Sequence, residues 1–364
     1  TTTRRQRQMC IRDRPFSHGG KKVIFHGKEW KSLEFNIVKV ETDKGITGWG
    51  EAFGYTSWKS VKIAIEDMVA PLLIGKDMAD IPKLLLTLQK SLHLFGRYGI
   101  TMFAISGVEI ALWDALGKEK NKPIHELLGK KNNDLFKAYS SLFRYGDPKI
   151  IEQKCKQSLD DGYQAIKLHE IENDCIEAGR KGTGNLPLML DTNCPWTYEE
   201  TLSKKEFLKK MKLTWLEEPV YPPEDYETLA KLRKELEIPI ACGENACTEF
   251  EFKSIINQEA VSYVQPSVIK VGGIYEMFKI IKFAETNNIS VMPHTAYFGP
   301  GFLATLQLAA LMQRDTYIER FYLDIDQEFY PNFKKAINGK FKLPSGPGLG
   351  TVSYTHLTLP TSGG

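Results

Sequence analysis

The feature that most constrains this 364-residue chain is a repeat that begins near residue 135. Short apolar runs alternate there with amphipathic helical windows, which is typical of βα units around a parallel sheet. Eight such runs predict an α/β fold, a TIM-like (β/α)8 barrel. The predicted strands are Lys137–Ser141, Gln164–His169, Pro187–Asp191, Leu213–Glu217, Pro239–Gly243, Val261–Pro266, Ile289–His294 and Asp315–Glu319. The predicted helices between them include Pro148–Asp160, Tyr198–Met211, Glu224–Leu236, Ile274–Thr286 and Phe302–Met312.

Polar or charged side chains end the predicted strands from the second onward, and successive ones lie 23 to 27 residues apart, one βα unit each time. Strands of a parallel barrel all point the same way, so these side chains should converge on its C-terminal mouth, where barrel enzymes carry their active sites. They are Lys167 and His169, Asp191 and Asn193, Glu217, Glu244, Ser267, His294 and Glu319.

An α+β module precedes the barrel. Alternating apolar residues on both sides of the turn Asp43–Gly45 predict an antiparallel hairpin over about residues 33–51. Apolar residues at three- and four-residue spacing then predict helices over Ser57–Leu73, Ile81–Leu94 and Thr101–Gly117. We expect a capping domain over residues 15–130, completed by about 320–350, and a catalytic barrel over 131–320.

The two ends of the chain differ in composition from everything between them. Residues 1–14 are rich in arginine, and residues 351–364 are rich in threonine, serine and glycine without charge. We interpret both as appended sequence from cloning or assembly read-through and exclude them from the fold. The alternative for the first segment is a basic arm that binds an acidic partner.

Charge and cysteine content bound the partners and the compartment. The formal net charge of +3 comes from the first segment, so the body is not basic and we expect no nucleic-acid partner. The chain has no apolar signal region, and we expect no membrane-spanning segment. Six scattered cysteines without paired spacing suit reduced thiols. We therefore expect a cytoplasmic protein.

Three carboxylates at neighbouring strand ends indicate a metal site. Asp191, Glu217 and Glu244 would repel one another unless a cation pairs with them, and no matching number of arginines is present. Hard oxygen ligands suit Mg²⁺, with substrate and water completing its octahedron. Any one of them could instead be a helix cap or an exposed acid, but all three at matching repeat positions favour the metal.

Basic groups flank this predicted metal site and indicate proton transfer at carbon. Lys167 and His169 lie on one side and His294 on the other. The α-proton of a carboxylate becomes removable when the charge that develops is neutralised, which the cation and Lys167 could do. Histidine can remove or return protons near neutrality.

The chain resembles the mandelate racemase-like branch of the enolase superfamily over about residues 20–350. The motifs are Gly48-Trp49-Gly50-Glu51, Ala111 to Lys118 (ALWDALGK), Leu190-Asp191-Thr192-Asn193, Trp215 to Pro219 (WLEEP), Gly243-Glu244-Asn245 and Lys270-Val271-Gly272-Gly273. The resemblance implies an α+β capping domain over a modified (β/α)7β barrel. It also implies Mg²⁺ on Asp191, Glu217 and Glu244, and a cap loop around Phe53–Trp58 that closes over the substrate.

Two departures from the family pattern bear on the mechanism. The second strand carries Lys167-Leu168-His169 where much of the branch has Lys-x-Lys, which makes His169 the expected base and leaves Lys167 for the substrate carboxylate. Ser267 stands where the family often has an aspartate coupled to the opposite histidine, so His294 should be the weaker base. This asymmetry favours one-way chemistry over racemisation.

The remaining candidates are substrate contacts. In the resembling enzymes the position of Glu319 hydrogen-bonds the substrate carboxylate, as the protonated acid; a salt bridge to Arg320 or Arg314 is the alternative. Asn193 could donate to a substrate hydroxyl or form an Asx turn. Lys270 could touch substrate or pair with a barrel carboxylate. Tyr55, Trp58, Tyr297 and Phe298 fall in loops over the mouth and are pocket candidates.

These expectations lead to one favoured function and three alternatives. The favoured function is Mg²⁺-dependent abstraction of the α-proton of a hydroxylated carboxylate, an acid sugar, followed by loss of water. A cycloisomerase, racemase or epimerase would use the same enediolate. A Schiff-base aldolase using Lys167 and a non-catalytic sugar-acid binding barrel remain open. We expect a small-molecule substrate and a homo-oligomer.

Overall fold

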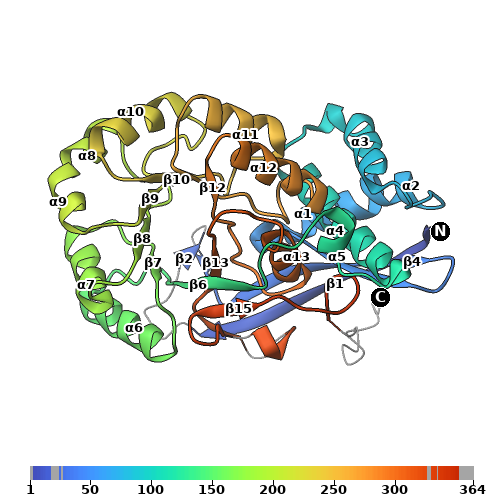
Figure 1. Cartoon of the computed structure of the whole chain (residues 1–364), viewed down its shortest axis with the longest axis horizontal. Helices are drawn as coiled ribbons and strands as arrows, with labels where there is room; N and C mark the ends of the chain where they lie inside the picture. Colours follow the sequence, from blue (N-terminus) through green and yellow to red (C-terminus); the bar gives the residue numbers. More distant parts are fainter. Residues whose placement is uncertain (1–2, 18–23, 26–27, 326–328, 334, 352–364) are drawn as a thin grey trace.

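The computed structural model describes residues 3–17, 24–25, 28–325, 329–333 and 335–351. A barrel of strands ringed by helices occupies one side of the molecule, and a smaller unit of a sheet and helices lies against it (Figure 1).

The barrel contains all eight predicted strands. They are β6 (Leu135–Ser141), β7 (Ile166–Leu168), β8 (Leu188–Asp191), β9 (Trp215–Glu217), β10 (Ile240–Cys242), β11 (Tyr263–Val264), β12 (Ser290–Val291) and β13 (Tyr317–Phe321). Their order is β12-β11-β10-β9-β8-β7-β6-β13 with parallel pairing, and β15 (Lys340–Lys342) adds to β6 antiparallel. Between β12 and β13 the Thr316 hydroxyl donates to the Val291 carbonyl (2.8 Å).

Helices connect consecutive strands. They are α6 (Pro148–Asp160), α7 (Asn173–Thr183), α8 (Tyr198–Ser203) with α9 (Lys205–Lys210), α10 (Tyr226–Leu236), α11 (Thr248–Asn257), α12 (Ile274–Thr286) and α13 (Pro300–Ala309). Counting α8 and α9 as one interrupted connection, seven βα units lead to a final strand, β13. This is the expected (β/α)7β barrel.

The cap is an antiparallel sheet backed by helices. The sheet has the order β14-β1-β4-β5, and β4 (Ser32–Thr42) and β5 (Thr47–Ala52) form the predicted hairpin. The other strands are β1 (Thr3–Ser17) and β14 (Asp324–Ile325), and β2 (Ile24–Phe25) pairs separately with β3 (Lys28–Glu29). The helices are η1 (Tyr55–Ser57), α1 (Trp58–Ile63), η2 (Ala64–Val69), α2 (Ala70–Leu73), α3 (Ile81–Ser91), η3 (His93–Phe95), α4 (Gly99–Lys120) and α5 (Ile124–Leu128), with η4 (Pro331–Phe333) near the C-terminus.

The N-terminal segment that we excluded from the fold is a strand in this structure. Strand β1 pairs antiparallel with β4 from Thr3 opposite Thr42 to Pro15 opposite Ser32, with two register shifts. The backbone groups along one side of β4 offer hydrogen bonds to any extended neighbour, whatever its side chains. That the segment is appended in origin stays a prediction, and residues 352–364 of the other end lie outside the described residues.

Helix α4 lies between the cap sheet and the barrel. It is 22 residues long and apolar enough to cross a membrane, but 83% of its most apolar window is buried inside the protein. It packs chiefly on β5 and β4, and it also touches α12 and α13 of the barrel. A helix that is apolar on all sides belongs in the core of a protein of this size.

Two buried glutamates of the cap join it to the barrel. Glu51 at the end of β5 accepts from the Gly301 backbone N–H (3.0 Å), in the first turn of α13. Glu109 of α4 accepts from the N–H groups of Ile274 (2.6 Å) and Tyr275 (2.9 Å), in the first turn of α12. Negative charge or a strong acceptor is favourable at a helix N-terminus. The glutamates therefore supply partners for backbone donors that packing has removed from water.

The Gly272-Gly273 pair provides room for this contact. Gly273 has φ +101°, and a Cβ added there would lie 2.1 Å from Oε2 of Glu109. The pair therefore serves a tight turn against the cap.

We expect Gly273→Ala to lower the free energy of unfolding by about 3 kcal/mol or more, because it combines a positive φ with a steric overlap. Gly45→Ala is the matched control, since Gly45 also has a positive φ (+76°) but no atom within 4 Å of an added Cβ. Denaturant unfolding of both variants measures the difference. Equal losses would show that the cost comes from φ alone.

Burial raises the pKa of Glu51 to about 8, against the opposing effect of its backbone hydrogen bonds. The folded protein then keeps this proton between about pH 4.5 and 8 while the unfolded chain loses it. The contribution of Glu51 to the free energy of unfolding should therefore fall as pH rises from about 4.5 to 8 and stay constant above about pH 8. Glu51→Gln keeps an acceptor for Gly301 and should flatten this part of the pH dependence. Melting temperatures from pH 4.5 to 9 measure it.

Candidate active site

Three carboxylates meet at the C-terminal mouth of the barrel. Asp191 ends β8, Glu217 ends β9, and Glu244 follows β10. One oxygen from each lies within 4.8 Å of the others. Asp191 and Glu217 are fully buried and Glu244 is partly exposed. The structure thus brings together the three residues predicted from separate strands, and their hard oxygen atoms fit a divalent cation.

Lys167 is the counter-ion of this cluster within the protein. Its ammonium lies 3.2 Å from Oδ2 of Asp191, 3.0 Å from Oε1 of Glu217 and 3.0 Å from Oε1 of Glu319. Burial alone would lower the pKa of Lys167, but Glu217 and Glu319 outweigh it and raise the pKa well above its ordinary value. We expected Lys167 to bind the substrate carboxylate. In the structure its buried ammonium contacts the three carboxylates, and Lys167 is not among the residues that line the cavity.

His169 lies at the cavity wall with a defined ring orientation. Its Nδ1 faces the Leu142 carbonyl, which can only accept, so Nδ1 carries a proton. Its Nε2 lies 3.3 Å from Oδ2 of Asp191. In the neutral ring Nε2 is therefore the basic atom, and the Asp191 carboxylate stabilises the imidazolium that forms when Nε2 takes a proton.

Asn193 and Arg144 hold the loops beside His169. Oδ1 of Asp191 accepts from both the backbone N–H and the side-chain amide of Asn193 (3.0 Å each), so the predicted Asx turn is present. Arg144 donates to the carbonyl oxygens of His169 and Thr192 and to Oδ1 of Asn193. We did not predict Arg144. It follows β6 without an acidic neighbour or a motif that marks it in the sequence.

His294 faces Glu244 from the opposite wall. Its Nε2 lies 3.1 Å from Oε2 of Glu244, and its buried Nδ1 has no hydrogen-bond partner among the described residues. Burial lowers the pKa of His294, against the opposing effect of Glu244 and Glu319. The expected absence of a carboxylate behind this ring is thus visible in the geometry.

Glu319 on β13 has a buried carboxylate with a basic neighbour. It pairs with Lys167, as given above, and accepts from the Thr295 N–H (3.0 Å). Burial would raise its pKa, but Lys167 and then His294 outweigh this effect and lower the pKa to about 2. A lowered pKa favours the ionised form over the expected protonated acid, and the sequence did not show how close Lys167 lies.

A cavity of about 580 Å³ opens above the cluster. Of the predicted residues, His169, Asn193, Glu244, Lys270, His294, Glu319 and Tyr55 line it. Aromatic side chains from both domains form much of its wall, and sequence reasoning missed all of them except Tyr55 and the loop residue Phe53. They are Trp30, Phe53, Tyr55, Tyr98, Phe103, Phe143 and Phe321.

Three predicted pocket residues are not part of this lining. Trp58 is the first residue of α1, directly after the cap loop, and is half-buried. Tyr297 is buried, and its hydroxyl lies 3.2 Å from the Thr305 hydroxyl. Its ring packs beside that of His294, at a centroid distance of 6.3 Å. Phe298 is buried against Arg320. Position in a loop over the mouth does not tell which way a side chain turns.

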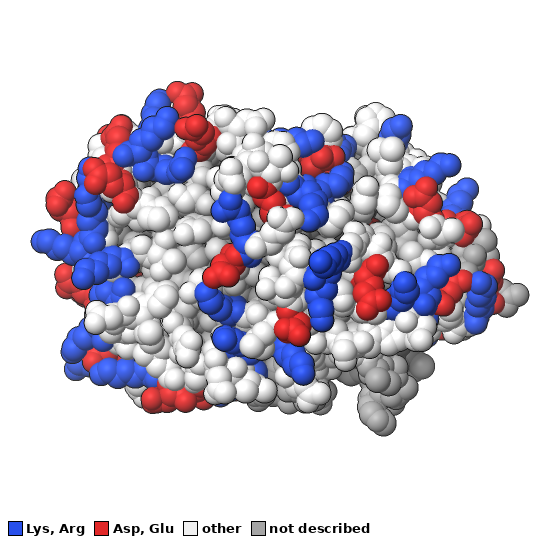
Figure 2. All heavy atoms as spheres, in the orientation of Figure 1, with Lys and Arg blue, Asp and Glu red and all other residues white. Residues whose placement is uncertain are grey.

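On the face that Figure 2 shows, the charged side chains of the described residues form no cluster of one sign like the carboxylates of this site. Lysine and arginine side chains alternate with aspartate and glutamate around the outer helices (Figure 2). Many form local pairs such as Lys231 with Glu227 and Lys156 with Glu152. Interspersed charge of this kind is typical of a solvated surface.

Two family profiles match the chain. The profile for the mandelate racemase/muconate lactonizing enzyme N-terminal domain matches residues 24–129, and the enolase C-terminal domain-like profile matches residues 151–353. They correspond to the cap and to the barrel.

Several known proteins are similar over most of their length. The arabinonate dehydratase of Saccharolobus solfataricus is 33% identical, over 87% of this chain and 88% of that protein. The D-galactarolactone cycloisomerase of Agrobacterium fabrum is 28% identical, over 86% and 87%. The crystal structure of the 3,6-anhydro-D-galactonate cycloisomerase from Zobellia galactanivorans superposes with a TM-score of 0.80, at 26% identity and 96% coverage of both chains.

We expect Lys167→Met to lower the free energy of unfolding by about 3–5 kcal/mol without divalent metal, because three buried carboxylates lose their cation. Added Mg²⁺ should raise the melting temperature of the variant more than that of the original chain, since the ammonium no longer competes. Thermal melts with Mg²⁺ and with chelator measure both effects. Lys231→Met, which removes an exposed pair, is the control and should change little.

Proposed function

The chain belongs to the mandelate racemase/muconate lactonizing enzyme family of the enolase superfamily, and on that premise we propose that it is an acid-sugar dehydratase. It removes the α-proton of a hydroxylated carboxylate and then eliminates water from the enediolate. We assign the metal site to Mg²⁺, held by Asp191, Glu217 and Glu244. When bound, Mg²⁺ supplies the positive charge that stabilises the substrate carboxylate as it gains a second negative charge.

The observation that carries this proposal is the orientation of His169. Its Nδ1 proton is fixed on the Leu142 carbonyl, which leaves Nε2 as the base, beside the carboxylate cluster at the cavity wall. A base needs this proximity to the group that holds the substrate carboxylate. Lys167 offsets part of the negative charge on the floor of the site, and Glu319 accepts a hydrogen bond from the Thr295 N–H there.

The opposite wall supports elimination over racemisation. Racemisation requires two bases of similar strength, one on each face of the α-carbon. His294 has no hydrogen-bond partner on Nδ1 among the described residues, and its Nε2 faces Glu244. In our proposal it donates a proton to the departing hydroxyl group.

Cycloisomerisation is the second candidate, because the wall of the cavity favours it. Aromatic faces pack well against the C–H face of a sugar ring, and Trp30, Phe53, Phe143 and Phe321 are among those that line the cavity. The names of the relatives include an arabinonate dehydratase and two cycloisomerases. Both reactions begin with the same proton abstraction.

Other parts of the functional assignment stay predictions. These are the role of Asn193 and Lys270 as substrate contacts, a homo-oligomeric state and a cytoplasmic location.

We expect incubation with Mg²⁺ in D₂O to exchange the α-proton of the accepted sugar acid or to yield a product lighter by one water. His169→Gln should reduce either rate by about 10²–10⁴-fold. A panel of linear aldonates, aldarates and anhydro- or lactone-type sugar acids, followed by mass spectrometry, separates dehydration from cycloisomerisation. His93→Gln, an exposed histidine of η3, is the matched control and should keep full activity.

Two results would contradict the proposal. Borohydride trapping of substrate on Lys167 in the presence of chelator would indicate a Schiff-base aldolase instead. Thermal stabilisation by sugar acids without turnover or exchange of any of them would indicate a binding protein.

A further inference from the structure

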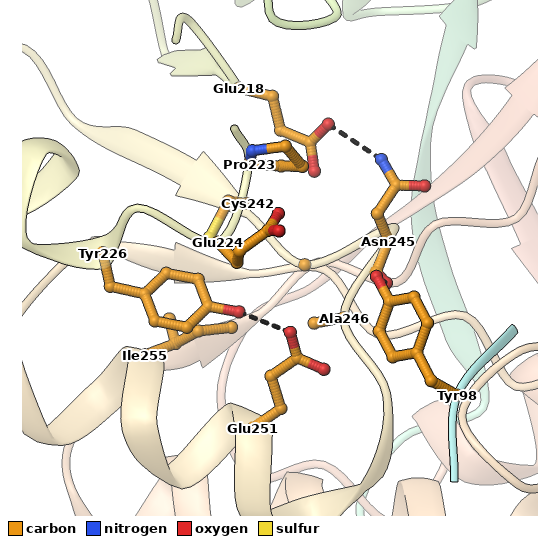
Figure 3. A pocket seen from close by; sticks show the side chains of 11 residues that line it. Tyr98, Glu218, Pro223, Glu224, Tyr226, Cys242, Asn245, Ala246, Glu251 and Ile255 are labelled. Atoms are coloured by element: carbon orange, nitrogen blue, oxygen red, sulfur yellow. Dashed lines mark hydrogen bonds between the residues drawn. The ribbon is translucent and has the colours of Figure 1, made fainter. Parts of the chain in front are cut away.

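A single asparagine lies behind the metal-site carboxylates. Asn245 follows Glu244 directly, in the loop after β10. Behind it is a small hollow of about 10 Å³, too small for more than one water (Figure 3). The hollow separates Asn245 from the buried side chain of Tyr226 and the half-buried side chain of Glu251, which hydrogen-bond one another (2.7 Å).

Every hydrogen-bonding function of the Asn245 side chain is engaged. The amide nitrogen donates to Oε2 of Glu218 (3.1 Å), as Figure 3 shows, and to Oε1 of Glu244 (3.2 Å). The amide oxygen accepts from the ammonium of Lys270 (3.1 Å). An amide has two donor hydrogens and one acceptor oxygen, so this set leaves it no alternative orientation.

The consequence falls on Glu244. One of its carboxylate oxygens is held by Asn245, and the other faces Nε2 of His294 (3.1 Å). Asp191 is braced by Asn193 and Lys167, and Glu217 by Lys167 and the Trp215 indole (2.9 Å). Glu244 is the partly exposed member of the three and makes no ion pair with Lys167 among the described residues. Among the described residues, Asn245 and His294 therefore hold the Glu244 carboxylate, one on each oxygen.

Asn245 also contacts the cap. The hydroxyl of Tyr98, the residue that precedes α4, donates to the backbone carbonyl of Asn245. The Lys270 ammonium that Asn245 binds lies over the ring of Phe53 in the cap loop, 4.8 Å from its centroid. Two cap residues thus reach the metal site through one barrel asparagine.

We propose that Asn245 is a positioning residue that fixes Glu244 for the metal and transmits the cap contact of Tyr98 to it. In other metal sites, the loss of a residue that orients a metal ligand commonly lowers metal affinity by about 10- to 100-fold. The inference rests on the proposed metal site but not on the identity of the substrate.

The experiment measures Mg²⁺ affinity by isothermal titration calorimetry, together with kcat and KM. Asn245→Leu keeps the shape of the side chain and removes its three side-chain hydrogen bonds, while the backbone carbonyl can still accept from Tyr98, and we expect it to weaken Mg²⁺ binding about 10- to 100-fold. Asn245→Ser is the second variant if the leucine does not fold, with the same direction expected. Tyr98→Phe removes only the cap hydroxyl and should weaken Mg²⁺ binding about two- to tenfold.

Asn132→Leu is the matched control. Asn132 donates to the Leu311 carbonyl (2.8 Å) in the segment that leads into β6, so its loss should lower the melting temperature without changing Mg²⁺ affinity. A folded Asn245 variant that binds Mg²⁺ as the original chain does would overturn the inference. Unchanged Mg²⁺ affinity in Tyr98→Phe would overturn the link to the cap. If the original chain takes up no Mg²⁺, the proposed metal site itself fails, which is a different result.

Discussion

The mutual repulsion of buried carboxylates is the constraint on which the rest of the site depends. Asp191, Glu217 and Glu319 share one buried ammonium, that of Lys167, and Glu244 adds a fourth acid at the edge. Burying this much negative charge beside a single cation is unfavourable in a protein interior. The arrangement becomes favourable when a dication joins it. The same electrostatic condition that makes the carboxylate cluster costly therefore favours metal binding and, through it, removal of the α-proton of a bound carboxylate.

The cap and the barrel depend on buried acids as well. Glu51 and Glu109 supply acceptors to the first turns of α13 and α12, and Asp114 accepts from the N–H groups of Trp49 and Leu349 (2.9 Å each). These residues explain why acidic side chains occur within the apolar motifs around Trp49 and Trp113. Glu51 and Glu109 join the cap to the barrel, and Asp114 joins α4 to β5 and to the segment around Leu349.

The barrel and its carboxylates were predictable because each strand repeats one local pattern and each acid has a fixed place in it. Helices α7 and α11 were not among the predicted windows. In α7, Gly179 packs against Leu168 and weakens the helical pattern, and the alternation Glu249-Phe250-Glu251-Phe252 in α11 resembles a strand. The pairing of β1 was missed because the segment's composition suggested appended sequence.

The aromatic wall and Arg144 could not be predicted, because their neighbours come from distant parts of the chain. Trp30 meets Tyr55 of the cap at a centroid distance of 5.1 Å and Phe143 of the barrel at 6.0 Å, although these residues lie far apart in the sequence. Likewise, the lowered pKa of Glu319 follows from its distance to the buried Lys167 in space. Strand ends determine which groups gather, whereas tertiary packing determines which of them reach the cavity.

The glutamates at the N-termini of α12 and α13 have a consequence for how this protein can diversify. They join the cap to the ring of helices, so moving the cap away as a body would break the hydrogen bonds of two carboxylates and three backbone N–H groups. Side chains of both the cap and the barrel line the cavity. Substitution of Trp30, Phe53 or Phe103 can therefore change which ligand the cavity accepts. The residues at the strand ends that carry the proposed proton transfer stay unchanged.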